Sequence, residues 1–392
     1  MKFVEDLDVR GKAVFVRVDF NVPLNDRREI RNDTRIRASL PTIEYILARA
    51  AKLILASHLG RPKGKPDPTM SLHPVAKRLA ELLGRDVVMA PDVVGPAVAK
   101  LKAGLPPGGV LLLENVRFHP GETKNDPVLA AALAEGIDVF VNDAFGSSHR
   151  AHASVVGIAG CVPVVAAGYL MKKEVDYLRK AIHPEKPYVA ILGGAKTEDK
   201  IPVIENLLLK ADDILIGGAM AYTFFLAQGH NPGKSLVEPD KVEISRGILA
   251  KAKEKGVNFV LPLDHVLTAS IESGRIERIV EGFPFPADLM GVDIGPKTVA
   301  AYREIISRAK TVFWNGPLGV FETPAFAEGT MAVAKAVAAS KAVTIIGGGD
   351  SIAAVAKAGV TDKITHISTG GGASLEFIAN ETLPGIEALE RP

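Results

Sequence analysis

Short apolar segments rich in valine, isoleucine and leucine alternate along this chain with longer stretches whose apolar residues recur every three or four positions. Most of the short segments end abruptly, either in glycines or in charged residues. This pattern predicts buried parallel strands that alternate with amphipathic helices. The expected fold class is therefore α/β, with doubly wound, mostly parallel sheets.

In the first half, polar loops follow each predicted strand. The predicted strands are Ala13–Val18, Leu53–Ala56, Val110–Leu113 and Ile137–Val141, and a helix-like stretch covers Arg35–Ala51. The loops begin with Asp19-Phe20-Asn21, Ser57-His58-Leu59-Gly60-Arg61, Glu114-Asn115-Val116-Arg117 and Asn142-Asp143. Because the carboxyl ends of parallel strands share one edge of a sheet, these loops should converge on one crevice.

That crevice would concentrate positive charge, which favours a phosphate or carboxylate site because an anion offsets the mutual repulsion. Alternatively, each arginine is a solvated surface residue or pairs with a nearby acid. Arg35 opens the helix-like stretch close to Arg31 and Arg37, and periodicity leaves open which of the three faces the crevice. The basic residues of the loops are Arg61, Arg117, Arg150, His58, His149 and His152.

In the second half, glycines follow the predicted strands. The strands Tyr188–Leu192, Asp213–Ile216, Val343–Ile346 and Ile364–Ser368 each lead into two or three glycines and then a predicted helix. Such turns expose backbone N–H groups at the positive end of a helix, which suits phosphate. At the turn after Ile346, we expect Asp350 or Ser351 to cap the helix.

Two lysines and one aspartate extend this phosphate hypothesis. Lys196 and Lys200 are four residues apart, so on the predicted helix after Gly193-Gly194 they share a face. Cations in the first turn of a helix are repelled by the positive end of the helix dipole, and an anion bound in front of them would offset that repulsion. This favours a polyphosphate site over a solvated lysine pair. Asp350 is then the natural carboxylate for Mg²⁺.

Length and composition indicate two domains and a reducing compartment. A chain of 392 residues exceeds one ordinary core, and Pro184 and Pro187 mark a junction after the predicted helix Met171–Ala181. The single cysteine, Cys161, excludes an intramolecular disulfide and is expected in the core. Met1–Arg10 has no apolar signal core, so we expect a cytoplasmic protein.

Several classes of partner and site are disfavoured. The net charge of +2 gives no indication of nucleic-acid binding. The apolar run Ala153–Met171 approaches the length of a membrane span, but Pro163 and glycines favour two buried strands. Gly229–Ser235 resembles a P-loop with one residue too few between its glycines, so we expect a turn. Dehydrogenase, zinc-protease, hydrolase and protein-kinase signatures are absent from the sequence.

An anion crevice in one half and a Mg²⁺-compatible nucleotide surface in the other favour phosphoryl transfer with domain closure. The chain resembles the phosphoglycerate kinase family over essentially its whole length. The segments that carry the resemblance are, in the family's order, RVDFNVP, SHLGRP, LLENVRFH, NDAFGSSHRAH, LGGAKTEDKI, MGVDIGPKT, WNGPLGVFE, IIGGGDS, STGGGASLE and ETLPGIEAL. Leu318 and Ser351 depart from the family's usual proline and threonine without removing a charge or donor.

The resemblance implies two doubly wound domains that face each other across a cleft and are joined by a hinge helix. It implies a 3-phosphoglycerate-binding domain at 1–170, a connecting helix at 171–186, a nucleotide-binding domain at 187–379 and a tail at 380–392 that returns to the first domain. The substrate-binding residues that it implies are Asp19, Phe20, Asn21, Arg35, His58, Leu59, Gly60, Arg61, Arg117 and Arg150. His149 and His152 match nearby histidines of the family.

For the nucleotide, the resemblance implies binding by Gly194, Lys196, Lys200, Gly218, Gly291, Asn315, Glu322, Gly348, Gly349, Asp350 and Ser351. Asp350 would hold Mg²⁺, and Arg35 would act on the transferred phosphoryl group, which the periodicity alone had left open. The residues given a catalytic role are Arg35, Lys196, Lys200, Gly349 and Gly372.

The implied reaction is reversible phosphoryl transfer from 1,3-bisphosphoglycerate to MgADP, giving 3-phosphoglycerate and MgATP. The implied partners are these small molecules, with no nucleic acid and no membrane, and the expected state is a monomer. The carboxylate nucleophile of the reverse reaction is ionised at neutral pH, so no general base is needed. Two alternatives remain, a kinase for a different small carboxylate and a phosphometabolite-binding protein without turnover.

Overall fold

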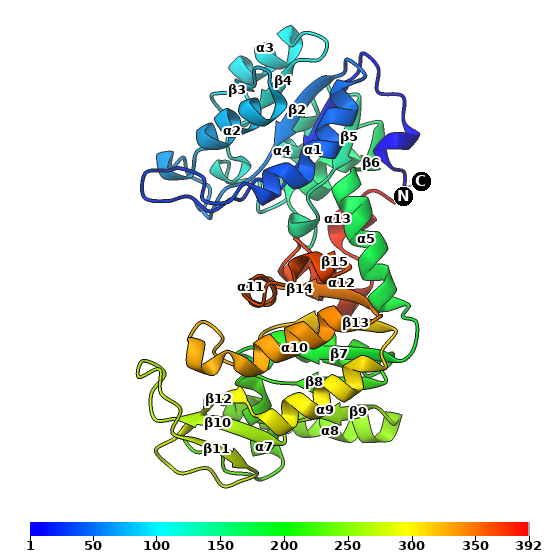
Figure 1. Cartoon of the computed structure of the whole chain (residues 1–392). Helices are drawn as coiled ribbons and strands as arrows, with labels where there is room; N and C mark the ends of the chain where they lie inside the picture. The colour runs from blue at the N-terminus through cyan, green and yellow to red at the C-terminus, as the bar shows by residue number, and fades with distance from the viewer. Residues whose placement is uncertain (391–392) are drawn as a thin grey trace. The chain divides into compact units, whose positions relative to one another are not determined.

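The computed structural model describes residues 1–390, which form two compact units (Figure 1). The first unit comprises Met1–Val175 and the segment that begins at Thr382, and the second comprises Asp176–Glu381. The division falls inside helix α5 (Tyr169–Ile182), within the connecting segment expected at 171–186. Among the described residues, no helix is both long and apolar enough to cross a bilayer.

The first unit is built on one six-stranded sheet in which every neighbouring pair is parallel. In spatial order its strands are β3 (Val88–Met89), β4 (Val110–Leu112), β2 (Lys52–Ala56), β1 (Ala13–Arg17), β5 (Val139–Asn142) and β6 (Val164–Ala167). Its helices are α1 (Thr34–Leu47), α2 (His73–Leu83), α3 (Pro96–Gly104), α4 (Pro127–Ala134) and α13 (Pro384–Glu387).

The second unit has a six-stranded parallel sheet and a smaller antiparallel sheet. The larger sheet runs β15 (His366–Ile367), β14 (Val343–Gly347), β13 (Thr311–Asn315), β7 (Tyr188–Leu192), β8 (Asp213–Ile216) and β9 (Asn258–Val260). The smaller runs β11 (Arg278–Glu281), β10 (Asp264–Thr268) and β12 (Met290–Ile294). Its helices are α6 (Ile201–Leu207), α7 (Met220–Ala227), α8 (Val242–Lys255), α9 (Pro296–Ser307), α10 (Glu328–Ala339), α11 (Gly349–Lys357) and α12 (Gly372–Asn380). The predicted fold class, two mostly parallel α/β sheets, is confirmed.

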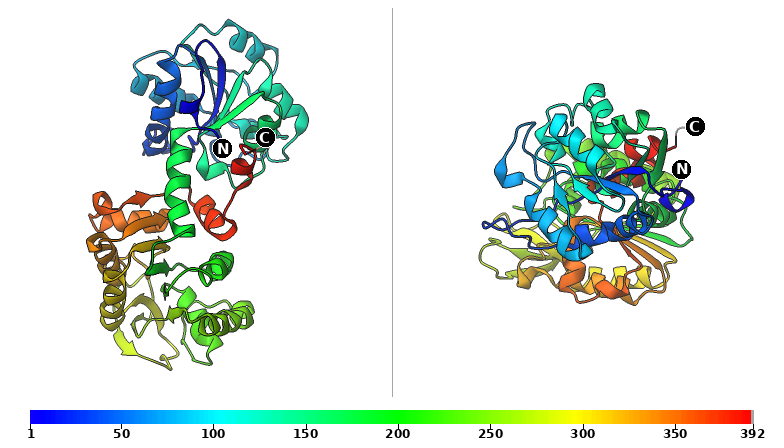
Figure 2. Two further views of the ribbon diagram at one scale, coloured as in Figure 1. Left: turned by 90° about the vertical axis from the view of Figure 1, so that its right-hand side faces the viewer. Right: turned by 90° about the horizontal axis from the view of Figure 1, so that it is seen from above.

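Short helical turns supplement these elements. The 3₁₀ turns are Val4–Asp6, Pro68–Met70, Val116–Phe118, Phe145–Ser147, Ile158–Gly160, Glu198–Lys200, Pro239–Lys241, Pro324–Phe326 and Thr361–Lys363, and a π turn covers Ala153–Gly157. The segment after Thr382, red in Figure 2, lies with the first unit, where the backbone N–H of Gly385 donates to the Ser148 carbonyl at 2.8 Å.

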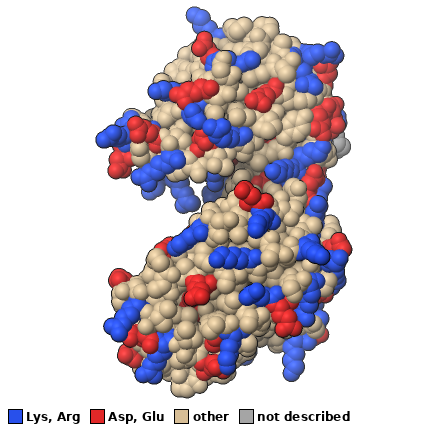
Figure 3. Space-filling view, in the orientation of Figure 1, with Lys and Arg blue, Asp and Glu red and all other residues tan. Residues whose placement is uncertain are grey.

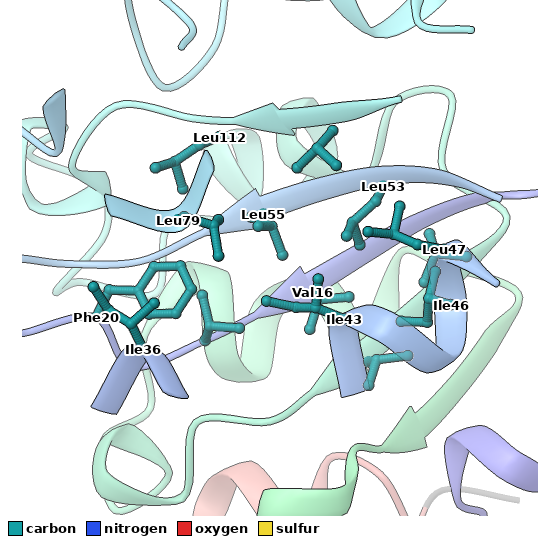
Figure 4. Close-up of a cluster of buried hydrophobic side chains, with 14 of the residues drawn as sticks. Val16, Phe20, Ile36, Ile43, Ile46, Leu47, Leu53, Leu55, Leu79 and Leu112 are labelled. Atoms are coloured by element: carbon teal, nitrogen blue, oxygen red, sulfur yellow. The ribbon is translucent and has the colours of Figure 1, made fainter. Parts of the chain in front are cut away.

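Helices cover the two six-stranded parallel sheets because the strands of these sheets are apolar on both faces. In the first unit, Val16 and Leu55 of the sheet share one buried cluster with Ile43 of α1 and Leu79 of α2 (Figure 4). In the second unit, α9, α10 and α11 bury Ile306, Val333 and Val355 on one face of the parallel sheet, which Figure 1 shows crossed by α9 and α10. The polar residues that end the strands lie at the carboxyl edge of each parallel sheet, where the loops of several strands meet.

Two expectations about Ala153–Met171 are wrong. The segment forms one strand, β6, after the π turn and a 3₁₀ turn, instead of two strands. The backbone N–H and hydroxyl of Ser154 both donate to the buried carboxylate of Glu122, which fixes a turn where the apolar pattern suggested a strand. Cys161, expected in the core, is exposed because it lies in the loop between the 3₁₀ turn and β6.

An unpartnered histidine lies in an aromatic cluster beside the smaller sheet of the second unit. The His265 ring is surrounded by Tyr222, Phe225, Phe283 and Phe285 at ring-centre distances of 5.6, 5.3, 5.2 and 4.9 Å. Neither of its ring nitrogens has a hydrogen-bond partner among the described residues. Burial lowers the pKa of His265 to about 4, so the imidazole is neutral at physiological pH.

Replacing His265 with phenylalanine should therefore stabilise the protein, by about 1 kcal/mol at pH 7, because two buried polar atoms without partners are removed. Between pH 6.5 and about 4 the unfolded imidazole binds a proton and the folded one does not, so wild-type stability from this group falls by about 1.4 kcal/mol per pH unit as the pH drops. Urea unfolding at pH 7 and pH 5 should show a smaller pH difference for His265→Phe. An unchanged difference, with exposed His73→Gln as control, would contradict the assignment.

Candidate active site

In the first unit, the loops after β1 and β2 are joined by polar contacts. The Asn21 side-chain oxygen accepts from the backbone N–H of Gly60 at 2.9 Å, and the Ser57 hydroxyl accepts from the N–H of Phe20 at 2.8 Å. Leu59 is buried between them. Gly60 has a φ of +62°, in the left-handed region that favours glycine. Two strand ends thus form one rigid edge.

Arg35 is the arginine of its helix that reaches this edge. It lies in the first turn of α1, and its Nη1 contacts the Asp19 carboxylate at 2.8 Å. Arg37 instead pairs with Asp33 at 3.0 Å on the surface, and Arg31 lies in the loop before the helix. The structure therefore separates three arginines that periodicity could not.

The remaining predicted arginines frame the same loops. Arg117 donates from Nη1 to the Gly60 carbonyl at 2.8 Å. Arg150 is exposed and donates from Nε to the His149 ring at 3.0 Å. Arg61 is exposed in the loop that follows β2. These side chains present guanidinium groups from three strand ends, which is the charge that a phosphate or carboxylate requires.

A buried ionic layer beneath these arginines was missed by the sequence analysis. Arg17, at the end of β1, is fully buried; its Nε donates to the Ser154 hydroxyl at 2.9 Å, and its Nη2 lies 3.3 Å from Nδ1 of His58. Glu122 is equally buried, accepts from the Ser154 hydroxyl at 2.6 Å and lies 3.6 Å from Nδ1 of His152. A charged residue inside an apolar strand could have flagged Arg17, but the loop around Glu122 carries no such signal.

This environment determines which groups are charged. Burial, reinforced by Arg17 and Arg117, lowers the pKa of His58 well below its usual value. Burial and Arg150 lower the pKa of His149 to about 4. Burial raises the pKa of Glu122, but His152, Arg17 and Ser154 outweigh it, so the net shift is downward. At neutral pH, His58 and His149 are therefore uncharged donors or acceptors, and the positive charge comes from the arginines.

In the second unit, the strand ends meet through backbone alone. The N–H of Gly194 donates to the Pro317 carbonyl and the N–H of Gly218 to the Leu318 carbonyl, both at 2.9 Å. A Cβ atom on Gly218 would lie 2.6 Å from the nitrogen of Gly194, and one on Gly193 would lie 2.1 Å from the Pro317 oxygen. Side chains cannot fit here, so glycines form the floor of the site.

Two hollows open above this floor. The first, of about 370 Å³, is bordered by the turns after β7, β13, β14 and β15. The second, of about 320 Å³, lies toward β12 and α7. Gly194, Pro317 and Asp350 line both hollows, so the two are adjacent. Gly372 and every residue predicted to bind nucleotide line one or both: Gly194, Lys196, Lys200, Gly218, Gly291, Asn315, Glu322, Gly348, Gly349, Asp350 and Ser351.

Side chains with fixed partners shape the first hollow. The ammonium group of Lys200 donates to the Asn315 side-chain oxygen, and the Asn315 amide donates to the Gly347 carbonyl at 2.8 Å. Burial lowers the pKa of Lys200, and Asp199 and Asp350 oppose that shift. The Ser351 hydroxyl accepts from the N–H of Gly316 at 2.6 Å. The first turns of α11 and α12 border the same space, so their positive ends face it.

Two local predictions are wrong. Lys196 does not lie on a helix with Lys200, since a 3₁₀ turn at Glu198–Lys200 comes first and α6 begins at Ile201, next to Pro202. The N-cap of α11 is Gly348, and no side chain caps the helix; Asp350 lies in the first turn, and Ser351 bonds to Gly316 instead. The carboxylate of Asp350 is exposed to the hollows and has no capping bond.

The apolar walls of the second hollow were also missed by the sequence analysis. Tyr222, Leu236, Met290 and Val320 line it. A Cβ on Gly291 would fall 1.8 Å from the Tyr222 hydroxyl oxygen, so this wall depends on glycine at 291. These residues come from α7, β12 and two loops, and no local pattern brings them together. An apolar hollow with a few polar groups beside it is typical of a small-molecule site.

The sequence matches the family model for phosphoglycerate kinase over residues 4–381. The chain belongs to the phosphoglycerate kinase family. It is 57% identical over 393 residues to the phosphoglycerate kinase of Anaeromyxobacter sp. (strain Fw109-5), which covers 100% of this chain and 99% of the relative. It is 58% identical to that of Acidobacterium capsulatum, with 98% of both chains covered.

Solved phosphoglycerate kinases have the same fold. The structure from Coxiella burnetii aligns with a TM-score of 0.90 and 40% identity over 98% of each chain. The structure from Pyrococcus horikoshii OT3 aligns with a TM-score of 0.82 and 37% identity, covering 100% of this chain and 98% of that one. Membership of the phosphoglycerate kinase family agrees with the resemblance inferred from the sequence motifs.

Proposed function

We propose that this protein transfers a phosphoryl group reversibly from 1,3-bisphosphoglycerate to MgADP, giving 3-phosphoglycerate and MgATP. The family supplies the reaction, and the observation that carries the proposal for this chain is the pair of adjacent hollows above the glycine floor. One hollow has lysine, asparagine and two helix starts for phosphates, and the other has apolar walls for a nucleoside.

On this proposal the first unit binds the phosphoglycerate. Arg61, Arg117 and Arg150 bind its phosphate and nearby oxygens, and Asp19 and Asn21 orient its other end. Phe20, Leu59 and Gly60 support those loops through buried contacts and backbone bonds. Neutral His58 contributes hydrogen bonds without adding to the repulsion among the arginines. The site therefore takes a small molecule with both a phosphate and a carboxylate.

The second unit binds the nucleotide. Glu322, Gly218 and Gly291 line the proposed nucleoside hollow, and Gly194, Lys196, Lys200, Asn315, Gly348, Gly349, Ser351 and Gly372 line the phosphate hollow, with Gly194 shared by both. During transfer, Arg35 and the two lysines stabilise negative charge on the phosphoryl oxygens. No proton needs to be removed, because the carboxylate nucleophile is already ionised at neutral pH.

Mg²⁺ fits the residues at the junction of the two hollows. Other acids line one hollow each, but among the described residues only Asp350 lines both, and it is exposed. Mg²⁺ binds through one or two carboxylates together with phosphate oxygens and water. When bound, the ion would neutralise charge on the nucleotide phosphates.

Asp350→Asn should lower kcat/KM for the magnesium nucleotide by about tenfold to a hundredfold, because a neutral amide is a weaker ligand for Mg²⁺. The apparent affinity for free Mg²⁺ should fall in parallel, whereas KM for 3-phosphoglycerate should change little. Steady-state rates over a magnesium titration measure both effects. Asp362→Asn, an exposed acid beyond α11, is the matched control. An unchanged magnesium dependence in Asp350→Asn would contradict the assignment.

A coupled assay with 3-phosphoglycerate and MgATP tests the reaction. Formation of an acyl phosphate that depends on 3-phosphoglycerate supports the proposal, and turnover with other carboxylates instead would indicate a different carboxylate kinase. Binding of both ligands without turnover would indicate a binding protein. Absence of any 3-phosphoglycerate-dependent turnover would reject the main proposal.

The proposal includes three further points, a hinge at α5, a monomeric state and a cytoplasmic location. The two ligands must meet for direct transfer, and α5 is the helix shared by both units. Small-angle scattering should therefore show compaction when both ligands bind, and its absence would contradict the hinge. Light scattering of the purified chain measures its molar mass, which tests the monomeric state. Fractionation of cells tests the cytoplasmic location.

A further inference from the structure

A large hollow of the first unit lies outside both proposed binding sites. It has a volume of about 890 Å³ and is bordered by the loop Arg27–Thr34 and the start of α2. None of the residues proposed to bind phosphoglycerate lines it. Figure 3 shows Lys and Arg side chains gathered, with a few acids, where the loop before α1 projects.

Most acidic side chains in this hollow already have cationic partners. Asp33 accepts from both Arg37 and Arg78, at 3.0 and 2.9 Å, and Glu81 accepts from Arg78 at 2.7 Å. Glu29 accepts from the Asn25 amide at 2.8 Å. Among the described residues, no carboxylate pairs with four other lining cations, Arg27, Arg28, Arg31 and Lys77. Arg28 donates to a backbone carbonyl, which leaves three side chains without a hydrogen bond or ion pair. The hollow therefore contains three free cationic side chains, Arg27, Arg31 and Lys77, and one carboxylate without a cationic partner, that of Glu29.

The loop that carries two of these cations is ordered by its own hydrogen bonds. The N–H of Asn25 donates to the Glu29 carbonyl at 2.9 Å, and the N–H of Arg28 donates to the Asn25 carbonyl at 2.8 Å. Arg28 has a φ of +61°, which is unusual for a residue with a side chain, and its Nη1 donates to the Pro68 carbonyl at 3.2 Å. Arg27 and Arg31 are thus presented by a fixed turn.

The backbone around the hollow adds positive potential. Thr34 begins α1 and His73 begins α2, and both residues line the hollow. The N-cap residue of neither helix makes a capping bond, although the N–H of Thr34 donates to the Asn32 side chain and that of His73 to the Ser71 hydroxyl. The positive ends of two helix dipoles therefore border the same space as the free cations.

We propose that this hollow is a second anion site, which binds a small molecule carrying two or more phosphate groups. Three free cations, two on the loop and one on α2, exceed what one phosphate needs, and the volume accommodates a larger ligand. Apart from His73, no lining residue has an aromatic ring on which a base could stack. The chemistry that fits is therefore a polyphosphate chain rather than a nucleotide.

Calorimetric titration with inorganic tripolyphosphate in magnesium-free buffer tests this site, with 3-phosphoglycerate and ADP present to occupy the two proposed substrate sites. We expect one binding event on the wild-type chain and at least a tenfold weaker one on the double variant Arg31→Gln/Lys77→Gln. Both residues are exposed, so the fold and the turnover of 3-phosphoglycerate should be unchanged. Inorganic phosphate should bind at least tenfold more weakly than tripolyphosphate.

The control is Lys100→Gln/Lys124→Gln, which removes two exposed cations of the same unit away from the hollow. It should change tripolyphosphate affinity less than twofold. Equal weakening in both variants would show general electrostatic attraction and overturn the site. So would no binding to the wild type, or binding unaffected by Arg31→Gln/Lys77→Gln. Equal affinity for phosphate and tripolyphosphate would overturn the ligand class. The comparison between variants holds whether or not the substrate sites are filled.

Discussion

Arg35→Ala should lower kcat by about a hundredfold to a thousandfold, with a much smaller change in KM for 3-phosphoglycerate. On the proposed mechanism, this guanidinium stabilises charge that develops on the phosphoryl group in transit, and such contacts act chiefly on the transition state. Arg35 is 36% exposed and held by Asp19, so it is positioned and still accessible to a ligand. Steady-state kinetics in both directions would measure the effect.

Arg37→Ala is the matched control for that experiment. It lies on the same helix and is paired with Asp33 at the surface, and its loss should leave kcat within about twofold of the wild type. Arg35→Lys separates charge from geometry, because lysine keeps the charge and loses the planar pair of donors. We expect only partial recovery. Turnover unaffected by Arg35→Ala would remove this residue from the mechanism.

Glu122→Ala should lower the free energy of unfolding by about 3–5 kcal/mol, because it leaves a buried guanidinium without its compensating charge. Arg17 and Glu122 are both fully buried, and they share the Ser154 hydroxyl. Loss of the carboxylate also leaves the N–H of Ser154, now 3.0 Å from a Glu122 oxygen, without an acceptor. Calorimetric or urea unfolding measures the change.

Two further variants separate charge from packing at this layer. Replacing both partners, as Arg17→Met/Glu122→Leu, should be less harmful than Glu122→Ala alone, since neither charge is then stranded. Glu81→Ala removes an exposed acid and should change stability by at most about 0.5 kcal/mol. If the double variant lost as much as the sum of its single losses, compensation of Arg17 by Glu122 would be the wrong account.

The sequence was most informative where function depends on strand ends. Buried apolar segments followed by glycines or arginines predicted both parallel sheets, and the carboxyl-end rule brought Asp19, Arg117 and Gly60 into one neighbourhood. Family resemblance then distinguished Arg35 from Arg31 and Arg37. The structure gives the physical reason, because only Arg35 among them pairs with Asp19.

The features that could not be predicted depend on contacts distant in sequence. Glu122 is recognisable only once Arg17 and Ser154 surround it, from positions far away in the chain. The helix predicted at Lys196 does not form, and α6 starts only at Ile201, beside Pro202. A spacing of four residues between two lysines is compatible with a helix but does not show that one is present. The wall formed by Tyr222 depends on the missing side chain of Gly291, which no periodicity reveals.

The glycine floor restricts how the proposed nucleotide site could be redesigned. Since Gly193, Gly218 and Gly316 lie directly against neighbouring main chain, this floor offers no side chain that could be exchanged. An engineer seeking a different nucleotide would have to leave that floor intact and alter Tyr222, Leu236 or Met290, where the wall is made of replaceable side chains. On the proposed assignment, backbone geometry therefore fixes the floor of the nucleotide site, whereas its preference for one base over another is open to design.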